Sequence, residues 1–266
     1  MTTLQIQVEG VGVWSSEVAD FAAVQAQQQG LASAAPPARP PAAMLPANER
    51  RRAPDSVLLA IEVAGQAVAM SGREASELPC VFSSAYGDQL ISDYMCATLA
   101  KAPAELSPTR FHNSVHNAPA GYWTIATGCH AASSAISAGH ASFGAGLLEA
   151  AALCLAEQRP VLLVCSDIAG SGPVGEMSGS RIAFGCALVL SPLQPGMNGL
   201  AQLDLTLQAH AEDTLQPGPP TGAWYEANPT AASAWPMLQN LARGEGRCTL
   251  AAAPTLALQV VLEKLA

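Results

Sequence analysis

The sequence predicts an α/β fold in which helices surround a mixed sheet. Short apolar segments with the patterns of strands alternate along the chain with longer segments whose apolar residues recur at helical spacing. Strands and helices that alternate in this way pack into layers. The 266 residues are expected to form a single domain, 1–266, with an Ala- and Pro-rich loop at 30–54 and a Pro- and Gly-rich break at 211–223.

The expected strands are short, and two patterns identify them. Residues 4–14 alternate between apolar and polar side chains, which is typical of a strand. The run "PVLLVCSDI" at 160–168 is almost wholly apolar, which favours a central, buried strand. The full set of expected strands is 4–14, 78–87, 133–138, 160–168, 180–192 and 200–209.

The expected helices carry apolar residues on one side, and some have recognisable ends. Ser16 is the expected N-cap of the first helix and Gly30 its stop, and Gly72 ends the second. The polar segment 107–121 is expected to be a loop. The expected helices are 16–30, 56–72, 88–103, 140–157, 233–242 and 254–264.

The composition indicates a large apolar interface. Half of the residues are apolar and 12% are charged, against roughly a quarter charged in ordinary soluble domains. The longest apolar runs, Val161–Cys165 and Cys186–Leu190, are far shorter than the ~20 residues of a membrane-spanning helix. The first ten residues lack the pattern of a signal peptide. We therefore expect a cytoplasmic protein, without a membrane span, that buries apolar surface against another subunit.

The charge and the cysteines exclude other classes. The formal net charge is −9, and the basic residues cluster only at Arg50–Arg52, so nucleic acid and anionic membranes are not expected as ligands. Seven cysteines are scattered without a CxxC pair. In a cytoplasmic chain this pattern favours buried thiols over disulfides.

Two motifs suggest ligands, but each has a simpler interpretation. Gly170–Gly175 fits G-x-G-x-x-G, yet a dinucleotide site needs a helix that opens at the last glycines, and Pro173 interrupts the motif. His112 and His116 have the spacing of two ligands on a helix, but their segment contains Asn, Ser and Pro and offers no third ligand. A hydrogen-bonding loop is favoured, and neither a cofactor nor a metal is expected.

Cys129 is the most suggestive candidate nucleophile. A nucleophilic thiol needs a lowered pKa and a base within reach. His130 is adjacent, but side chains at positions i and i+1 diverge. The spacing alone therefore favours a buried structural cysteine.

The segment from Ser107 to Ile168 resembles the N-terminal half of β-ketoacyl synthases, the condensing enzymes of fatty-acid and polyketide synthesis. The matching residues are Ser107-Pro108, Asn117, Ala120-Gly121, the strand Val161–Val164 and "FGCALVL" at 184–190. The resemblance covers about 56–192 well. It implies a thiolase-like layered fold, truncated to about the N-terminal half of the family plus a short C-terminal extension.

In this register the nucleophilic cysteine of the family falls on His140, and Cys129 lies well upstream. "GHAS" stands where the family has "ACxS". An imidazole there could not form the thioester that carries the growing acyl chain. The two catalytic histidines of the family lie in its second half, for which this chain has no matching motif. The resemblance therefore implies that the chain is not an enzyme on its own.

The segments "HNSVHNAPAGYW" and "SFGAGLLEA" resemble the truncated chain-length-factor-like proteins of aryl-polyene pigment clusters. That resemblance implies a heterodimer with a full-length ketosynthase, whose acyl tunnel this chain would shape. An acyl carrier protein would bind mainly to the partner, because carrier proteins are usually acidic and this chain is too. The residues expected at the partner's tunnel are Thr109, Arg110, Ser114 and Val115. Those expected to meet the partner across the two-fold axis are Ser133, Ser134, Ala135, Ile136, Ser137 and Ala138.

Two alternatives remain open on the sequence alone. The chain could be a stand-alone acyltransferase or other thiol enzyme that uses Cys129, or a homodimeric acyl-binding protein. The absence of the family's second half would leave one face of the sheet uncovered. Either the partner or the helices expected at 233–242 and 254–264 would have to cover it.

Overall fold

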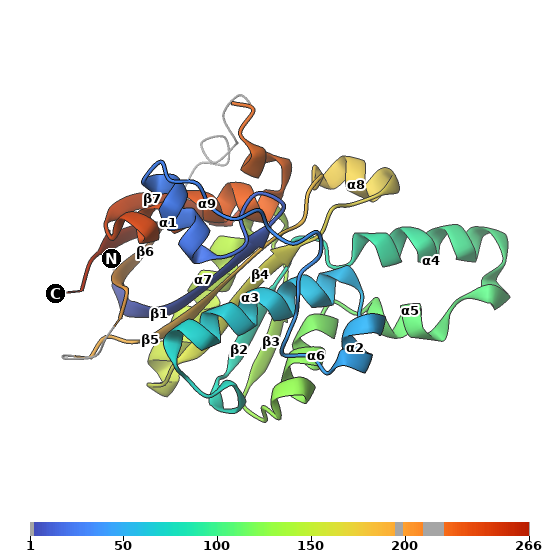
Figure 1. Ribbon diagram of the computed structural model, residues 1–266, viewed down its shortest axis with the longest axis horizontal. Helices are drawn as coiled ribbons and strands as arrows, with labels where there is room; N and C mark the ends of the chain where they lie inside the picture. The colour runs from blue at the N-terminus through green and yellow to red at the C-terminus, as the bar shows by residue number, and fades with distance from the viewer. Residues whose placement is uncertain (1–2, 195–198, 210–220, 266) are drawn as a thin grey trace.

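A computed structural model describes residues 3–194, 199–209 and 221–265 (Figure 1). In these ranges eight strands form one mixed sheet in the order β3-β2-β4-β5-β1-β6-β8-β7. The strands are β1 (Thr3–Ser15), β2 (Cys80–Ser83), β3 (Ser133–Ile136), β4 (Val161–Asp167), β5 (Phe184–Pro192), β6 (Ala201–Ala209), β7 (Gly246–Ala253) and β8 (Leu256–Glu263). The α-helices are α1 (Phe21–Gln28), α2 (Ala47–Arg52), α3 (Asp55–Ser71), α4 (Gln89–Lys101), α5 (Pro108–Asn113), α6 (Ala118–Thr127), α7 (Ser142–Glu157), α8 (Gly172–Ser178) and α9 (Pro229–Arg243).

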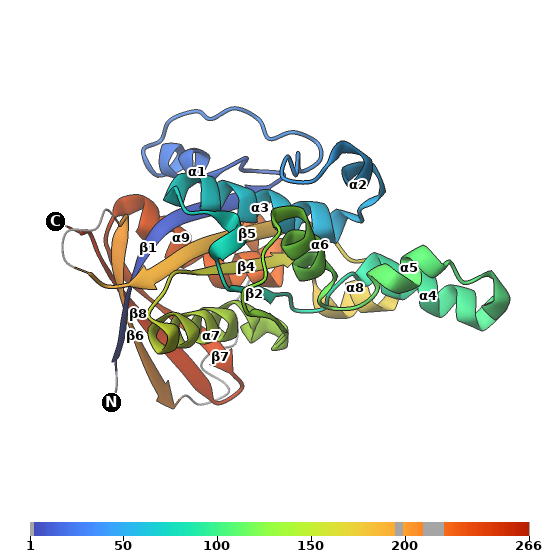
Figure 2. The ribbon, with the colours of Figure 1, turned by 90° about the horizontal axis from the view of Figure 1, so that it is seen from below.

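Helices cover both faces of the sheet. Helices α3 and α6 pack on one face, and α7 and α9 on the other (Figure 2). Each face has its own apolar core. The strands β4 and β5 lie between these cores, and every residue of both is buried. This burial explains their continuous apolar sequences and confirms the predicted layered α/β fold.

The C-terminal strands fold over α7 instead of extending the sheet away from it. Helix α7 packs against both β4 and β7 (Figure 2). The approach is close: a Cβ at Gly144 would lie 2.1 Å from the carbonyl oxygen of Ala251. The chain's own α9 and the β7–β8 hairpin thus cover the face that the sequence analysis left open.

The prediction of a helix at 254–264 is wrong, because this segment forms the strand β8. Its side chains Leu258, Val260 and Leu262 are buried at every second position, which is the period of a strand. Antiparallel partners on both sides, β6 and β7, decide the structure of this short apolar run. The helix predicted at 233–242 is confirmed within α9, and "RCTLAA", which follows it at 247–252, belongs to β7.

Two other predictions need correction. Helix α1 begins after Asp20, whose Oδ1 accepts a hydrogen bond from the Ala23 amide at 2.8 Å, so Ser16 is not its N-cap. The loop expected at 30–54 contains the short helix α2. The break at 211–223 lies, except for its last three residues, outside the described residues. The predicted end of α3 is confirmed, since Gly72 adopts the left-handed conformation with φ of 67°.

The prediction of a loop at 107–121 is also wrong, because this segment forms α5 and the start of α6. Ser107 caps α5, its hydroxyl accepting from the Arg110 amide at 3.4 Å, and Pro108 occupies the first turn. Pro119 has the same position in α6. A proline in the first turn costs no hydrogen bond, so these prolines start helices here instead of breaking them.

Helices α4 and α5 form an arm that projects from the body of the protein (Figures 1 and 2). The buried residues of α4 are Gln89 and Ile91, both in its first turn, and the buried residue of α5 is Asn113, at its end. The apolar side chains of Leu99 and Phe111 are 50% and 58% exposed. The arm therefore presents apolar surface that the chain itself does not cover.

Candidate functional site

The parallel strands β3, β2 and β4 end at the start of α7. Parallel strands place their carboxyl ends at the same edge of a sheet, where ligand sites of α/β proteins gather. His140 lies in the 3-10 turn η3 (Gly139–Ala141) between β3 and α7, and it is exposed. The edge of one ring faces the other in the pair His140 and Tyr86, with centroids 6.3 Å apart and planes at 88°.

Hydrogen bonds fix the turn between β3 and α7. The Ser142 hydroxyl donates to the Gly139 carbonyl at 2.6 Å and accepts from the Ala138 amide at 2.9 Å. From β2, the Ser83 hydroxyl donates to the Ser142 carbonyl at 2.7 Å. Gly139 has φ of 55°, a left-handed conformation that suits glycine. The turn that carries His140 is therefore held in one shape.

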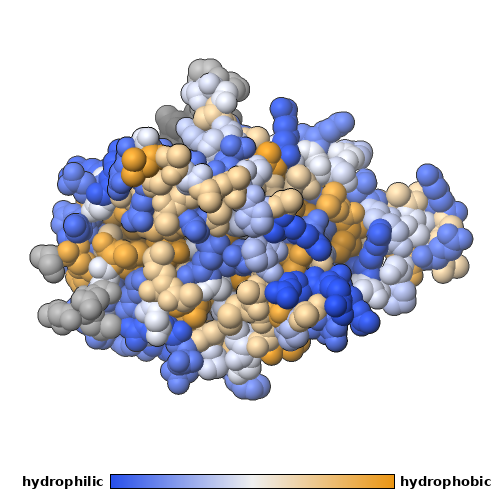
Figure 3. All heavy atoms as spheres, viewed as in Figure 1, coloured by the Kyte–Doolittle hydropathy of each residue, from blue (hydrophilic) through white to orange (hydrophobic). Residues whose placement is uncertain are grey.

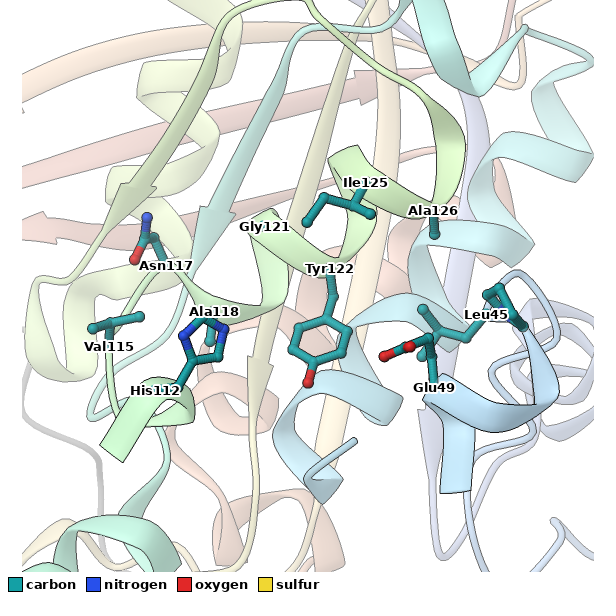
Figure 4. A pocket seen from close by; sticks show the side chains of 11 residues that line it. Leu45, Glu49, His112, Val115, Asn117, Ala118, Gly121, Tyr122, Ile125 and Ala126 are labelled. Atoms are coloured by element: carbon teal, nitrogen blue, oxygen red, sulfur yellow. The ribbon is translucent and has the colours of Figure 1, made fainter. Parts of the chain in front are cut away.

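A second feature is an open groove of about 360 Å³ between α2, α5 and α6 (Figure 4). The side chains of His112, Tyr122 and Glu49 reach into it from three different helices. The Tyr122 hydroxyl donates to Asn113 Oδ1 at 3.3 Å. The remaining lining residues are Leu45, Pro46, Val115, Asn117, Ala118, Gly121, Ile125 and Ala126.

The rim of the groove combines apolar and basic surface. Ile125 and Val115 are 85% and 51% exposed, which is unusual for large apolar side chains. The last turn of α2 consists of Arg50–Arg52. Figure 3 shows hydrophilic surface over α2 beside more apolar surface over α6. Apolar residues thus line most of the groove, Glu49 of α2 stands in its wall, and Arg50–Arg52 follow Glu49 outside the lining.

The structure separates the predicted interface residues into two groups. Thr109 and Arg110 are exposed on α5, and the Arg110 guanidinium lies 4.0 Å from the centre of the Tyr94 ring. Ser114 follows α5 and its hydroxyl donates to the Phe111 carbonyl at 2.7 Å. Val115 lines the groove.

The second group is the strand β3 and the two residues after it. Ser133, Ser134, Ala135 and Ile136 form β3 at one end of the sheet, where β3 pairs with β2 among the described strands. Ser137 and Ala138 follow and are exposed. Helix α5 packs on α4, whereas β3 packs on β2 and α6. Helix α6 contacts both groups, since it packs on β3 and its Tyr122 hydroxyl donates to Asn113 of α5.

Cys129 has the surroundings of a structural thiol. It is 5% exposed, and its Sγ donates to the Leu78 carbonyl at 3.3 Å. His130, next to it, is exposed. This geometry agrees with the interpretation that the spacing favoured, a buried cysteine.

The glycine motif serves packing, although one expectation about it is wrong. A helix, α8, does open at Gly172, with Pro173 in its first turn. A Cβ at Gly172 would lie 2.2 Å from Asp93 Oδ1, and one at Gly175 would lie 2.6 Å from the backbone of Gly170. A carboxylate therefore abuts the start of the motif, where a dinucleotide would place its pyrophosphate.

His112 and His116, the two histidines with ligand spacing, lie in different environments. His112 is in α5, so the expectation that its segment is not helical is wrong. His116 lies after α5, with Nε2 3.2 Å from the Ser84 carbonyl oxygen. Among the residues that the structure describes, no three His, Cys, Asp or Glu side chains are grouped as metal ligands would be.

The sequence analysis missed Asp167, Tyr86 and the groove. Asp167 ends the apolar strand β4 and is 1% exposed. A carboxylate at the end of a wholly apolar run was the one available signal, since such a group must find buried donors. The groove had no signal, because it depends on how α2 and α5 pack against α6.

Comparison with known proteins assigns the chain to a family. The model of the family described as "Beta-ketoacyl synthase, N-terminal domain" matches residues 22–253, and the chain belongs to this family. A comparison with curated proteins finds no match.

Solved structures share the fold at low sequence identity. One is a ketosynthase in complex with its chain length factor from Xenorhabdus doucetiae, with a TM-score of 0.73, 22% identity, and coverage of 97% of this chain and 99% of that chain. Another is the ishigamide ketosynthase/chain length factor, with a TM-score of 0.75, 12% identity, and coverage of 99% and 100%.

A third structure relates the chain to a longer ketosynthase. The ketosynthase from module 1 of the bacillaene synthase of Bacillus amyloliquefaciens has a TM-score of 0.57 and 11% identity. The match covers 79% of this chain and 47% of that ketosynthase. The fold is therefore the truncated thiolase-like one that the sequence resemblance implied.

One segment, Gly139–Glu157, is long and apolar enough to cross a membrane by length and composition. It consists of η3 and α7. Its residues Phe143, Leu147 and Ala151 are buried in the core between β4 and β7. It is placed as the core helix of a folded domain.

Proposed function

We propose that the chain is a non-catalytic, chain-length-factor-like subunit that binds a full-length ketosynthase and bounds its acyl tunnel. The observation that carries the proposal is the turn between β3 and α7. It is held by Ser83 and Ser142 in a fixed shape, yet presents the imidazole of His140. In the register of the family resemblance this is the place of the nucleophilic cysteine.

The exposed apolar surface supports a partner. Leu99, Phe111, Val115 and Ile125 lie on the arm, on α6 and at the groove, and each is at least half exposed. Surface of this kind is characteristic of protein interfaces. The groove is the part of this surface that could border an acyl chain, because apolar residues line most of it.

The edge strand β3 supports the expected pairing across a two-fold axis. Its small side chains, Ser133, Ser134 and Ala135, would let a second strand approach closely. We place the acyl carrier protein mainly on the ketosynthase, and the complex in the cytoplasm. The continuous sheet, which joins β1 to the C-terminal β8 through β6, supports a single domain over 1–266.

The first test is co-expression with a full-length ketosynthase of the same organism, followed by mass measurement of the purified complex. A one-to-one complex is expected. A soluble monomer or a homodimer that ignores the ketosynthase would contradict the proposal, and the homodimer would favour an acyl-binding protein instead.

The second test places the interface. Ile125→Asp should weaken binding of the ketosynthase about thirtyfold, which corresponds to the loss of one interfacial hot spot. Leu31→Asp is the matched control, because Leu31 is 59% exposed but lies outside the arm, α6 and the groove. Equal binding by the two variants would refute this placement.

The third test concerns Cys129. Cys129→Ala should leave the product of the reconstituted pair unchanged, measured by mass spectrometry of the acyl products. Loss of acyl transfer would instead favour the stand-alone thiol enzyme.

A further inference from the structure

We propose that Asp167 positions three residues of the candidate site through the loop 84–87. The three are Ser137, His140 and His116, which lies in the chain between the groove-lining residues Val115 and Asn117. The inference rests on the proposed function only in its consequence, namely that these residues face the partner. The positioning itself is a property of this chain.

One side of the loop is bound by the Asp167 carboxylate. The Ser84 hydroxyl donates to Oδ1 at 2.7 Å, and the Ala85 amide donates to Oδ1 at 3.0 Å and to Oδ2 at 3.2 Å. The Tyr86 amide is a further donor. Asp167 is 1% exposed, so water does not compete for these bonds.

The other side of the same loop contacts the candidate site, residue by residue. His116 Nε2 lies 3.2 Å from the carbonyl oxygen of Ser84, which can only accept, so Nε2 carries the hydrogen. The hydroxyl of Ser137 donates to the Ala85 carbonyl at 2.9 Å. The Tyr86 and His140 rings form an edge-to-face pair.

Each residue of Ser84–Tyr86 is thus held by Asp167 on one side and holds a site residue on the other. A change at Asp167 must move the three site residues together, because they have this loop in common. The Thr230 hydroxyl of α9 also donates to Oδ2 of Asp167. The carboxylate therefore joins the C-terminal helix to the site as well.

The surroundings of Asp167 call for a hydrogen-bond acceptor. Burial raises the pKa of its carboxyl, and the donors from Thr230, Ser84 and the loop amides oppose that rise. All of these neighbours donate hydrogen bonds. An amide in the same place would turn its own N–H groups toward them, so Asn is not a neutral replacement.

The test is the rate at which diethyl pyrocarbonate modifies each histidine, read by mass spectrometry of peptides from the purified chain. In Asp167→Asn, modification of His116 should be about fivefold faster, the factor that corresponds to the loss of one neutral hydrogen bond. His130 is exposed and outside the network, so its rate should stay the same.

Ser84→Ala keeps the test decisive if Asp167→Asn unfolds. It removes the hydroxyl's bond to Asp167 and the bond that the hydroxyl accepts from the Gly87 amide at 2.9 Å. Modification of His116 should become about twofold faster, toward the lower limit for one hydrogen bond. Ser180→Ala is the matched control. It removes a buried hydroxyl that donates to the Ile168 carbonyl and accepts from the Asn228 amide, which also donates to the backbone carbonyl of Asp167. It has no bond to the Asp167 carboxylate or to the loop 84–87.

The proposal is overturned if His116 responds no more than His130 in Ser84→Ala, or no more than it does in Ser180→Ala. The consequence for function is measured separately, as the distribution of product lengths from the reconstituted pair. Asp167→Asn should shift that distribution relative to the chain with Asp167 in place. If the chain with Asp167 in place forms no pair with a ketosynthase, the proposed function fails. The rates of histidine modification still show whether Asp167 positions His116.

Discussion

Replacement of Glu9 by Gln should destabilise the folded chain in a pH-dependent way. Glu9 lies at the bulge of β1, and its side chain is 4% exposed. The Arg73 guanidinium binds it with two hydrogen bonds of 2.7 Å, from Nε and Nη2. The Ser191 hydroxyl donates a third bond of 2.7 Å from the neighbouring strand β5.

The magnitude follows from these contacts. Gln keeps the shape of Glu9 but loses the charge that the two Arg73 bonds use. Hydrogen bonds to charged groups contribute about 1.5–3 kcal/mol each to stability. One third of the Arg73 side chain is exposed, 33%, so solvent recovers part of the loss, and we expect a cost of about 2 kcal/mol in the free energy of unfolding.

The sign of the pH dependence follows from the pKa of Glu9. Burial by itself raises this pKa, but the hydrogen bonds and charge of Arg73 and the Ser191 hydroxyl outweigh burial, so the pKa is lowered. Stability from a lowered carboxyl pKa is fully present above the unfolded value, about 4.3, and is lost as the pH falls through the folded value. The cost of Glu9→Gln should therefore be complete at pH 7 and shrink below about pH 4.

The assay is urea denaturation of both chains at pH 7 and at successively lower pH. The control is Arg39→Gln, which breaks the exposed ion pair with Asp55, whose side chains are 53% and 54% exposed. Exposed pairs contribute about 0–1 kcal/mol. A cost for Glu9→Gln that equals the control at pH 7, or that stays unchanged as the pH falls well below about 4, would refute the reasoning.

Two further predictions concern packing and thiols. Gly144→Ala should destabilise the chain by about 1–3 kcal/mol, because the new Cβ would meet the Ala251 carbonyl in a packed core. Gly121→Ala should instead stabilise α6 by about 0.5–1 kcal/mol, because its Cβ would meet nothing within 4 Å. Urea denaturation measures both effects. Iodoacetamide at pH 8 should label the exposed Cys96 first and leave Cys80 unlabelled, since burial raises the pKa of Cys80 to about 11. Peptide mass spectrometry checks the order, and labelling of Cys80 as fast as Cys96 would contradict it.

Local sequence patterns predicted correctly those elements whose residues all give the same signal. The sequence of β4 is mostly apolar because both faces of this strand are buried in apolar cores. Helix α3 ends at Gly72 because the left-handed conformation there suits glycine. Segments with mixed signals were interpreted wrongly. In 107–121 the prolines and polar residues of a loop are also those of two helix starts.

Part of the candidate site could be predicted in the same way. The resemblance singled out His140 and the strand β3, and the structure places His140 in a fixed turn directly after that strand. Its role as the counterpart of the family's nucleophile stays a prediction. The link from Asp167 through Ser84–Tyr86 to the site could not be predicted, because it joins residues about 80 positions apart in the chain.

The sequence by itself determined the layered α/β class, the central buried strands and the excess of apolar over charged surface, since these depend on composition and on short-range periodicity. Tertiary structure alone decided that 256–263 is a strand, that the β7–β8 hairpin covers α7, and that α2, α5 and α6 enclose a groove. The physical reason is that short apolar segments have nearly equal local preferences for helix and strand. The free energy that separates the two comes from partners such as β6 and α7, which lie far away in the chain.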